Sequence, residues 1–279
     1  MPRTKAISMT NDGSAPADLA ELYGMVIENV QKTTLSTALK SQQYTGNPAA
    51  GSVEFKRFAN SESKAYGTAR TAGKGDKVKA PPTTVNLDQH KEIVEEIAKF
   101  DLETFGVTNI MKRRADNHAL SMAATLDRAF FTQAASEATK LTPKGTAIQE
   151  IVEEMIQAVE TVKNDYVDGV ERELIAVVLS PAKYGAIRTF LDTQPNTNVD
   201  TAGEEFGMYH GAKVYSSTRL PSTTNGIAMV IGAVAQPVVS DQYTEPEKIP
   251  LSNDFDVSLF YDYGTKSLTP DLMFKWETT

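Results

Sequence analysis

The chain has 279 residues, a formal net charge of −8 and no cysteine. A composition of 41% hydrophobic and 23% charged residues is typical of a globular protein and excludes disorder throughout. Without cysteine, the chain has no disulfides, no thiolate zinc sites and no cysteine nucleophile. The acidic balance argues against a dedicated nucleic-acid binder, whose affinity would rest on a basic surface. The first residues contain no apolar core of a signal peptide, and the longest apolar run is far shorter than the roughly 20 residues that cross a bilayer.

The first fifty residues are predicted to form an N-terminal arm. Residues 1 to 16 are polar and indicate a mobile terminus. Apolar residues at helical spacing then predict an amphipathic helix from Ala17 to about Lys40. Glycine and proline between Gln42 and Ser52 predict a linker into the next segment.

Residues 52–83 are predicted to form an extended arm. Their apolar residues are spread too thinly to build a core, and a two-stranded excursion of this kind is marginal alone in water. We therefore expect the arm to lie on its own body or on a neighbouring subunit. Between Val53 and Lys91 there are eight basic and four acidic residues, whereas acidic residues are prominent between 202 and 262. The basic arm of one subunit could therefore complement the acidic body of the next copy. Alternatively, these charges are scattered over the surface and solvated.

A charged amphipathic helix is predicted at residues 88–105, after the arm. A longer apolar stripe predicts one helix from Gly106 to about Glu137, some 45 Å long at about 1.5 Å per residue. A further helix is expected from Thr142 and Pro143 to near Gly169. The rest alternates between strands and helix: a buried strand at 174–179, a helix at 182–191, a polar loop at 192–207, strands at 213–217 and 227–234, and closing antiparallel strands at 255–263 and 272–276.

Residues that could carry chemistry are few and dispersed. The segment GTARTAGKG at residues 67–75 lacks the spacing of a phosphate-binding loop. His90, His118 and His210 are far apart in the sequence, which favours surface or packing roles over a metal site. Ser180 precedes a proline without a glycine elbow, so a helix N-cap explains it better than a hydrolase nucleophile does.

Paired carboxylates give no stronger signal. Neighbouring glutamates at 95/96 and 153/154 point about 100° apart on a helix and are expected to be solvated. Asp254 and Asp256 share a strand face and could bind a cation. No catalytic residue, cofactor or metal site is predicted.

The order of these elements resembles the major capsid protein of tailed bacteriophages, with the Hong Kong 97-type fold. The segments that carry the resemblance are GDKVKAPPTTVNLDQHKEIVEEI, TLDRAFF, AVVLSPAKYGAI, YHGAKVYSSTRLP and DFDVSLFYDYGTKSLTPDLMFKW. The resemblance implies an α+β fold with an N-terminal arm at 1–51 and an extended loop at 52–83. It implies a peripheral domain with a long spine helix at 84–169 and 241–279, and an axial domain at 170–240.

By this resemblance the chain self-assembles as hexamers and pentamers into an icosahedral head shell, the capsid of the virion, which encloses double-stranded DNA without sequence-specific binding. Assembly would take place in the host cytoplasm, with a separate scaffolding protein, a portal and decoration proteins as partners. No membrane is involved. The residues expected at contacts between subunits are Phe55, Arg57, Arg70, Lys74, Lys77, Lys79, Glu204, Glu205, Glu245 and Glu247.

Three alternatives stay open at this point. An encapsulin-type compartment shares the fold, but encapsulins typically begin with a helix that lines the interior. A soluble α/β enzyme could use Asp254, Asp256 or the 192–207 loop, although cysteine is absent and the histidines are dispersed. A phage tail-tube or other virion protein is disfavoured by the long helix.

Overall fold

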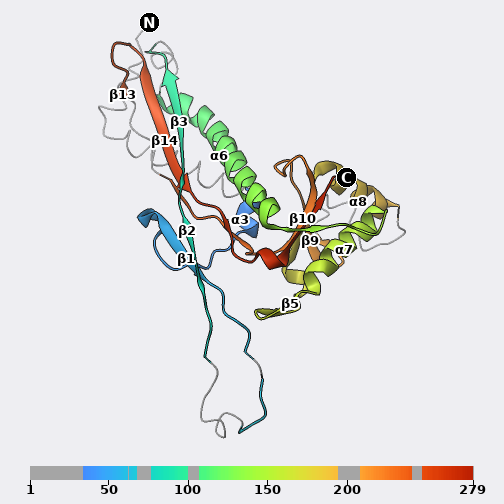
Figure 1. The fold of residues 1–279 in the computed structure, drawn as a ribbon. Coiled ribbons are helices and arrows are strands. Elements are labelled where there is room, and N and C mark those ends of the chain that lie inside the picture. The colour runs from blue at the N-terminus through green and yellow to red at the C-terminus, as the bar shows by residue number, and fades with distance from the viewer. Residues whose placement is uncertain are drawn as a thin grey trace. The chain divides into compact units, whose positions relative to one another are not determined.

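The computed structural model describes residues 34–61, 63–67, 77–99, 107–193, 208–240 and 247–278, apart from the side chains of 107–116, 247 and 257. The described part is a mixture of helices and strands (Figure 1), as the expected α+β class requires. The chain divides into two compact units. Unit 1 comprises Met1–Ala38, Asn86–Ala129 and Pro237–Gly264, and unit 2 comprises Leu39–Val85, Phe130–Gln236 and Thr265–Thr279.

Unit 2 is built on a six-stranded sheet in the order β4-β16-β10-β7-β9-β8. These strands are β4 (Thr139–Leu141), β7 (Ile175–Leu179), β8 (Met208–Tyr209), β9 (Ala212–Ser216), β10 (Thr224–Val230) and β16 (Met273–Glu277). β10 runs antiparallel to β7 and β16, whereas β7 and β9 are parallel. All five residues of β7 are buried, because strands lie on both of its edges and helices cover it.

Two helices, α7 (Ile148–Glu160) and α8 (Pro181–Asp192), pack on this sheet. One stripe of α7 is apolar and buried, comprising Ile151, Val152, Met155, Ile156 and Val159. This stripe contacts β7, β10 and β16, and together with the strands it forms the largest buried cluster of unit 2. Burial of the stripe, rather than helix propensity alone, holds α7 in place.

The arm has two legs, one leading out and one returning, which are paired at their root by β1 (Ser52–Lys56) and β2 (Pro82–Asn86) (Figure 1). Val53, Phe55, Val85 and Ala235 form a small buried cluster there, against which Leu268 packs. Beyond the strands, the amide of Ala59 donates to the carbonyl of Lys79 at 2.9 Å, so the two legs stay side by side. The short strands β11 (Val234–Ala235) and β15 (Lys266–Ser267) pair beneath the root.

Unit 1 is a long antiparallel ribbon with a helix beside it (Figure 1). β3 (Gln89–Ile97) pairs with β14 (Phe255–Tyr263) over nine residue pairs, and β12 (Val238–Ser240) and β13 (Glu247–Lys248) pair with the other edge of β14. The helix is the first part of α6 (Val107–Glu137), whose Ala119, Met122, Ala123 and Leu126 are buried. Asp127 on this helix accepts hydrogen bonds from the amides of Leu35 and Ser36, at 3.3 and 3.0 Å, and so caps the start of α3 (Leu35–Leu39).

The helix predicted at residues 88–105 is wrong over its described part. Residues 89–97 form strand β3, and residues 100–106 lie outside the described part. Along β3, burial alternates: Ile93 and Ile97 turn inward, while Val94 between them is 53% exposed. Pairing with β14, which is remote in sequence, decides the conformation, because the same apolar spacing also fits a helix.

Most other predicted elements are confirmed, with shifted ends. α6, β7, α8, β9, β14 and β16 lie where the sequence places them, and the strand expected at 227–234 is divided into β10 and β11 by a turn at Gly232. α7 ends at Glu160 rather than near Gly169, because residues 163–168 form a hairpin of β5 (Lys163–Asn164) and β6 (Val167–Asp168). Within the described residues, no helix combines the length and the apolarity needed for a membrane crossing.

The buried stripe of α7 gives a test of the core of unit 2. Met155 has no exposed surface, so Met155→Ala leaves a cavity and is expected to lower the free energy of unfolding by about 2–5 kcal/mol. Urea denaturation of the unassembled subunit measures the change. Gln149→Ala, at a partly exposed position of the same helix, is the control and should cost within about 0.5 kcal/mol.

Candidate functional site

The root of the arm is fixed by an ion pair between Arg57 and Asp271. The two guanidinium nitrogens of Arg57 donate to the two carboxylate oxygens of Asp271, at 2.7 and 2.8 Å. The side-chain amide of Asn164 donates to the same carboxylate at 2.6 Å, and the guanidinium lies 4.3 Å from the ring centroid of Tyr166. A half-buried bidentate pair of this kind fixes orientation as well as distance. We call Arg57, Asn164, Tyr166 and Asp271 the arm clamp.

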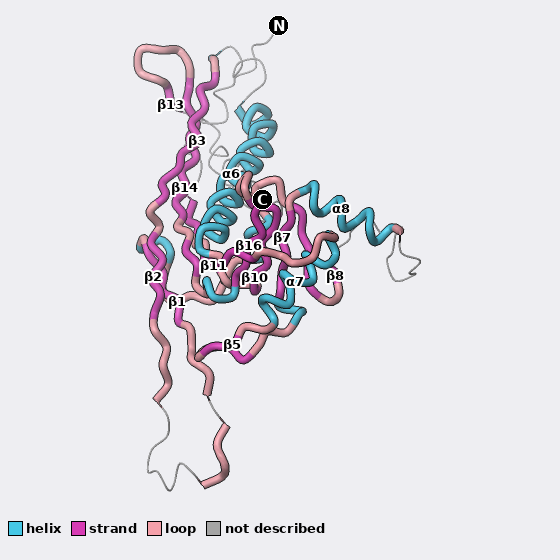
Figure 2. The backbone as a smooth tube through the Cα atoms, turned by 45° about the vertical axis from the view of Figure 1, so that its right-hand side comes forward, coloured by secondary structure: helices cyan, strands magenta, loops and turns pink. Residues whose placement is uncertain are grey.

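The clamp joins three parts of the chain that are far apart in sequence. Arg57 follows β1, Asp271 belongs to the short helix η3 (Pro270–Leu272), and Asn164 and Tyr166 come from the β5–β6 hairpin. Asn164 also shapes that hairpin, because its side-chain oxygen accepts from the amides of Tyr166 and Val167 at 2.9 and 3.0 Å. Figure 2 shows β5 beside the arm, where the amide of Asn60 donates to the carbonyl of Asp165 at 3.0 Å.

The protonation of Asp271 reflects both its burial and its partners. Burial raises the pKa of this carboxyl, while the hydrogen bonds and charge of Arg57 and the hydrogen bond of Asn164 lower it. The pKa of Asp271 therefore lies below its ordinary value of 3.8. The clamp is thus an ion pair at neutral pH and is weakened only in acid.

A cavity of about 870 Å³ lies between the legs of the arm and the β5–β6 hairpin. Its charged lining residues are Lys64, Lys77, Lys79, Lys163, Asp165 and Asp168. Lys163 is paired with Asp168 at 2.8 Å across the hairpin, whereas Lys77 and Lys79 lie exposed on the arm. The charged lining of the cavity therefore includes two exposed lysines that belong to the arm itself.

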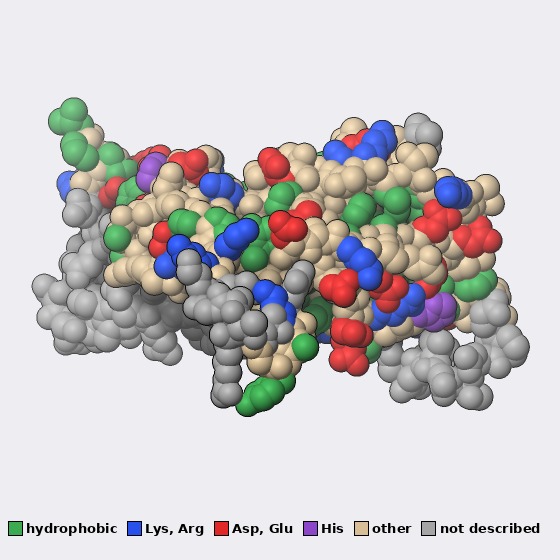
Figure 3. Space-filling model, turned by 60° about the horizontal axis from the view of Figure 1, so that its bottom comes forward, with side chains coloured by type: hydrophobic (Ala, Val, Ile, Leu, Met, Phe, Trp, Pro, Cys, Tyr) green, Lys and Arg blue, Asp and Glu red, His purple; other side chains and the backbone are tan. Residues whose placement is uncertain are grey.

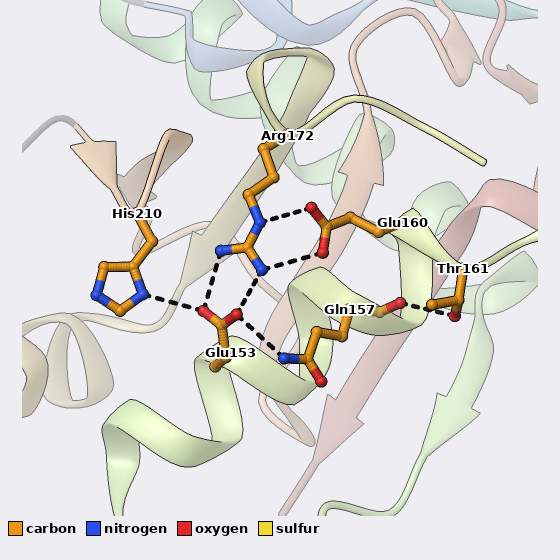
Figure 4. A network of polar contacts seen from close by, with 6 residues as sticks. All are labelled: Glu153, Gln157, Glu160, Thr161, Arg172 and His210. Atoms are coloured by element: carbon orange, nitrogen blue, oxygen red, sulfur yellow. Dashed lines mark hydrogen bonds and ion pairs between the residues drawn. The ribbon is translucent and has the colours of Figure 1, made fainter.

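A second charged group, drawn in Figure 4, lies on the surface of unit 2. Arg172 bridges Glu153 and Glu160 of α7; one of its nitrogens lies 3.0 Å from Glu160, and another lies 3.3 Å from Glu153. Gln157 also donates to Glu153, at 3.2 Å. The hydrogen bond from Arg172 is the main cause that lowers the pKa of Glu153, and the two carboxylates together raise the pKa of Arg172. Arg172 ties the segment before β7 to the helix that covers the sheet.

The same network fixes the tight turn between β8 and β9. His210 and Gly211 form this turn with φ values of +48° and +94°, a conformation common in two-residue hairpins. The imidazole stacks on Tyr209 with ring centroids 4.1 Å apart, and its Nδ1 lies 3.1 Å from Glu153. Glu153 therefore connects the hairpin, the helix and Arg172 (Figure 4).

These charged groups form ion pairs and hydrogen bonds within the subunit. Each histidine has a carboxylate close by: Asp262 lies 2.7 Å from His90, Glu95 lies 3.1 Å from the buried His118, and Glu153 lies next to His210. In the described part of the chain, no group of three or more His, Asp or Glu residues could hold a metal ion. Asp254, considered for a cation, accepts hydrogen bonds from the hydroxyl of Ser252 and the amide of Lys99. On the face shown in Figure 3, cationic and acidic side chains lie among one another rather than in separate fields.

The structure places the predicted contact residues in different situations. Phe55 is buried at the arm root, Arg57 belongs to the clamp, and Lys77 and Lys79 are exposed. Outside the described residues lie Arg70, Lys74, Glu204, Glu205 and Glu245, together with the side chain of Glu247, whose backbone is in β13. Sequence reasoning missed Asp271, which is 214 residues from Arg57 and gives no local signal. It also missed Arg172, although Glu153 and Glu160 are seven residues apart and therefore share a helix face.

Comparison with known proteins decides between the alternatives. A family model described as phage capsid protein matches residues 92–275, well over half of the chain. The chain belongs to the phage capsid protein family. Its function is therefore that of a major capsid protein of a phage head, and the encapsulin-type alternative is not favoured. No curated protein sequence matches the chain.

Solved structures confirm the fold expected for this family. A structure from Mycobacterium phage Che8 has 18% sequence identity and a TM-score of 0.58, covering 85% of this chain and 93% of that one. The capsid structure of cyanophage P-SCSP1u has 14% identity and a TM-score of 0.64, covering 88% of each chain. A virus-like particle from Pyrococcus furiosus has 11% identity and a TM-score of 0.58, covering 92% and 98%. At these identities the likeness establishes the Hong Kong 97-type fold, while the family match establishes the phage capsid.

The clamp predicts a pH-dependent contribution to stability. Asp271→Asn removes the charge that Arg57 pairs with and should lower the free energy of unfolding by about 1–3 kcal/mol at neutral pH. Because the pKa of Asp271 is lowered on folding, this contribution is complete above 3.8 and is lost as the pH falls through the folded value. Denaturant titrations of both proteins across this range measure the difference.

Asp168→Asn is the control, since its partner Lys163 is exposed and the pair is screened by solvent. It should change stability little at any pH. A cost for Asp271→Asn that persists undiminished in acid would show that the ion pair is not its cause.

Proposed function

We propose that this capsid protein is the subunit from which the whole icosahedral shell of a tailed bacteriophage head is assembled, as hexamers and pentamers around double-stranded DNA. The family match over residues 92–275 carries this proposal. Ion pairs within the subunit, such as Arg57 with Asp271 and Arg172 with Glu153 and Glu160, hold the fold and are consistent with a structural role. The net charge of −8 is consistent with a shell that encloses DNA without holding its phosphates.

The proposed role of residues 52–83 is that of an extended loop lying on a neighbouring subunit. Its legs expose apolar side chains: Phe58 is 62% exposed, Tyr66 93% and Val78 76%. Exposed apolar groups on a projecting arm are typical of a surface that is covered on assembly. Lys77 and Lys79 flank Val78, so the arm offers an apolar centre with a basic margin.

The arm clamp would hold this arm in the orientation that assembly requires. Because Phe55 and Arg57 are engaged within their own subunit, they act in this proposal by fixing the arm root, whereas Lys77 and Lys79 contact the neighbour. A pre-organised arm loses less conformational freedom on docking than a free one. The remaining predicted residues, Arg70, Lys74, Glu204, Glu205, Glu245 and Glu247, stay proposed contacts.

The domain roles follow the same proposal. Residues 1–51 are the N-terminal arm, 170–240 the axial domain, and 84–169 with 241–279 the peripheral domain, with α6 as the spine helix. The compact units separate the chain after Ala129 and after Gly264, so α7 shares a unit with the proposed axial residues. A separate scaffolding protein, a portal and decoration proteins are the proposed partners, and assembly in the host cytoplasm leads to the virion.

Light scattering and negative-stain microscopy of the purified protein, alone and with the phage's scaffolding protein, test the proposal. Closed particles tens of nanometres across are expected. A protein that forms no particle under either condition would contradict it.

The exposed lysines of the arm give a sharper prediction. Lys77→Glu with Lys79→Glu reverses the basic margin and should reduce the yield of closed particles at least tenfold while leaving the unassembled subunit folded. Particle yield is measured by sedimentation and folding by circular dichroism. The matched control reverses two exposed lysines outside the arm, Lys144→Glu with Lys213→Glu, and should assemble normally. Equal loss in both proteins would show a general effect of charge.

A further inference from the structure

Two side-chain hydroxyls at β15 are buried without a hydrogen-bond partner. The hydroxyl oxygens of Ser267 and Thr269 are both inaccessible to solvent, and neither has a partner among the described residues. A buried hydroxyl that makes no hydrogen bond destabilises the fold, so native proteins leave few such groups unpaired. Here two of them lie within three consecutive residues, which indicates that a further group satisfies both.

The main chain around the two hydroxyls is held by β11. Ser267 pairs with Val234 across the ladder, and the carbonyl of Ala233 accepts from the amides of Leu268 and Thr269 at 2.8 and 3.2 Å. Leu268, between the two hydroxyl residues, packs against the buried cluster of the arm root. The strand therefore cannot shift to bring either hydroxyl to a new partner without breaking these contacts.

The other strand of the ladder offers no side-chain partner. Ala233 and Val234 are apolar and buried. One step further along the ladder, the side-chain amide of Gln236 donates to the hydroxyl of Thr265 at 3.3 Å. The polar group that satisfies Ser267 and Thr269 therefore comes from outside this pair of strands.

Thr269 also lies next to the arm clamp. It is the N-cap residue of η3, the short helix that carries Asp271. A threonine at this position usually accepts a hydrogen bond from a main-chain amide with its hydroxyl, but the hydroxyl of Thr269 makes no such bond. Instead, the amide of Leu272 donates to the carbonyl of Thr269 at 3.0 Å. The hydroxyl is therefore available to another group two residues before the carboxylate that binds Arg57.

We propose that one ordered water molecule bridges the hydroxyls of Ser267 and Thr269 and so supports the turn that presents Asp271 to the arm clamp. A hydroxyl both donates and accepts, so each can bond to a water, and buried waters typically make two to four hydrogen bonds. Residues two apart in an extended chain are separated by about 7 Å at Cα. A water that bonds to two hydroxyls at about 2.8 Å each joins oxygens up to about 5.5 Å apart, which fits this spacing. The site lies within one subunit and does not depend on shell assembly.

Thr269→Val tests the site, because it removes the hydroxyl at nearly constant volume. Loss of a bridging water leaves Ser267 without its partner, so the Tm measured by calorimetry should fall by about 2–4 °C. If the hydroxyl had no partner at all, its removal would instead raise the Tm. An unchanged or higher Tm would overturn the proposal. Thr142→Val, at an exposed threonine, is the matched control and should stay within about 1 °C.

Ser267→Ala tests whether the two hydroxyls share one ligand. Because either change alone removes the bridge, the double variant with Thr269→Val should lose little more than the larger of the two single losses. Losses that add in full would show that the two hydroxyls act separately, which rules out a shared water.

A second double variant tests the support of the arm clamp. Asp271→Asn weakens the clamp, so in that background Thr269→Val should lower the Tm by less than half as much as it does alone. An equal loss in both backgrounds would show that the hydroxyl of Thr269 does not position Asp271.

A high-resolution experimental structure identifies the bridging group directly. Density for one ordered water within about 3.2 Å of both hydroxyl oxygens is expected in the unchanged protein and should be lost in Thr269→Val. A side chain from elsewhere in the chain or from a neighbouring subunit at that place would overturn the proposal.

Discussion

The arm depends on one physical constraint: it has too little apolar surface to hold its own shape, so its root must be fixed by the rest of the subunit. Two interactions do this. The small cluster around Phe55 buries one side of the β1–β2 pair, and the bidentate bond between Arg57 and Asp271 fixes the direction in which the chain leaves it. The hairpin that carries Asn164 and Tyr166 supports the same point. The described legs of the arm form no strand between Lys56 and Pro82, so their direction depends on this fixed root.

In the charged network of unit 2, as in the arm clamp, one carboxylate contacts several segments that are separate in the sequence. Glu153 receives hydrogen bonds from Arg172 and Gln157 and lies next to His210, so one carboxylate organises a helix, the segment before a strand and a hairpin turn. Partly buried ion pairs of this kind add geometric definition more than they add stability. In both places, arginine does what lysine would do less well, because its planar group binds two oxygens at fixed angles.

Sequence reasoning succeeded where the information is local. The long stripe of α6, the continuous apolar run of β7 and the alternation of β14 each predict their own conformation. It failed at β3, where Ile93 and Ile97 fit a helix and a strand equally well and the deciding partner, β14, lies more than 150 residues away. The arm clamp was only half found for the same reason: Arg57 is visible as a basic residue of the arm, but Asp271 has no local pattern. The order of elements along the chain nevertheless identified the fold, because the wrong assignment of β3 leaves the order of the other elements unchanged.

The position of Asp271 has a consequence for the order of events during protein synthesis. The chain grows from its N-terminus, so the arm emerges from the ribosome more than 200 residues before the carboxylate that fixes it. β16 (Met273–Glu277), which pairs with β4 and β10 in the six-stranded sheet, is also synthesised after Asp271. A nascent subunit therefore has an arm that is not yet fixed in direction and a sheet that is incomplete. Competence for assembly therefore requires that Asp271 and β16 have both been synthesised.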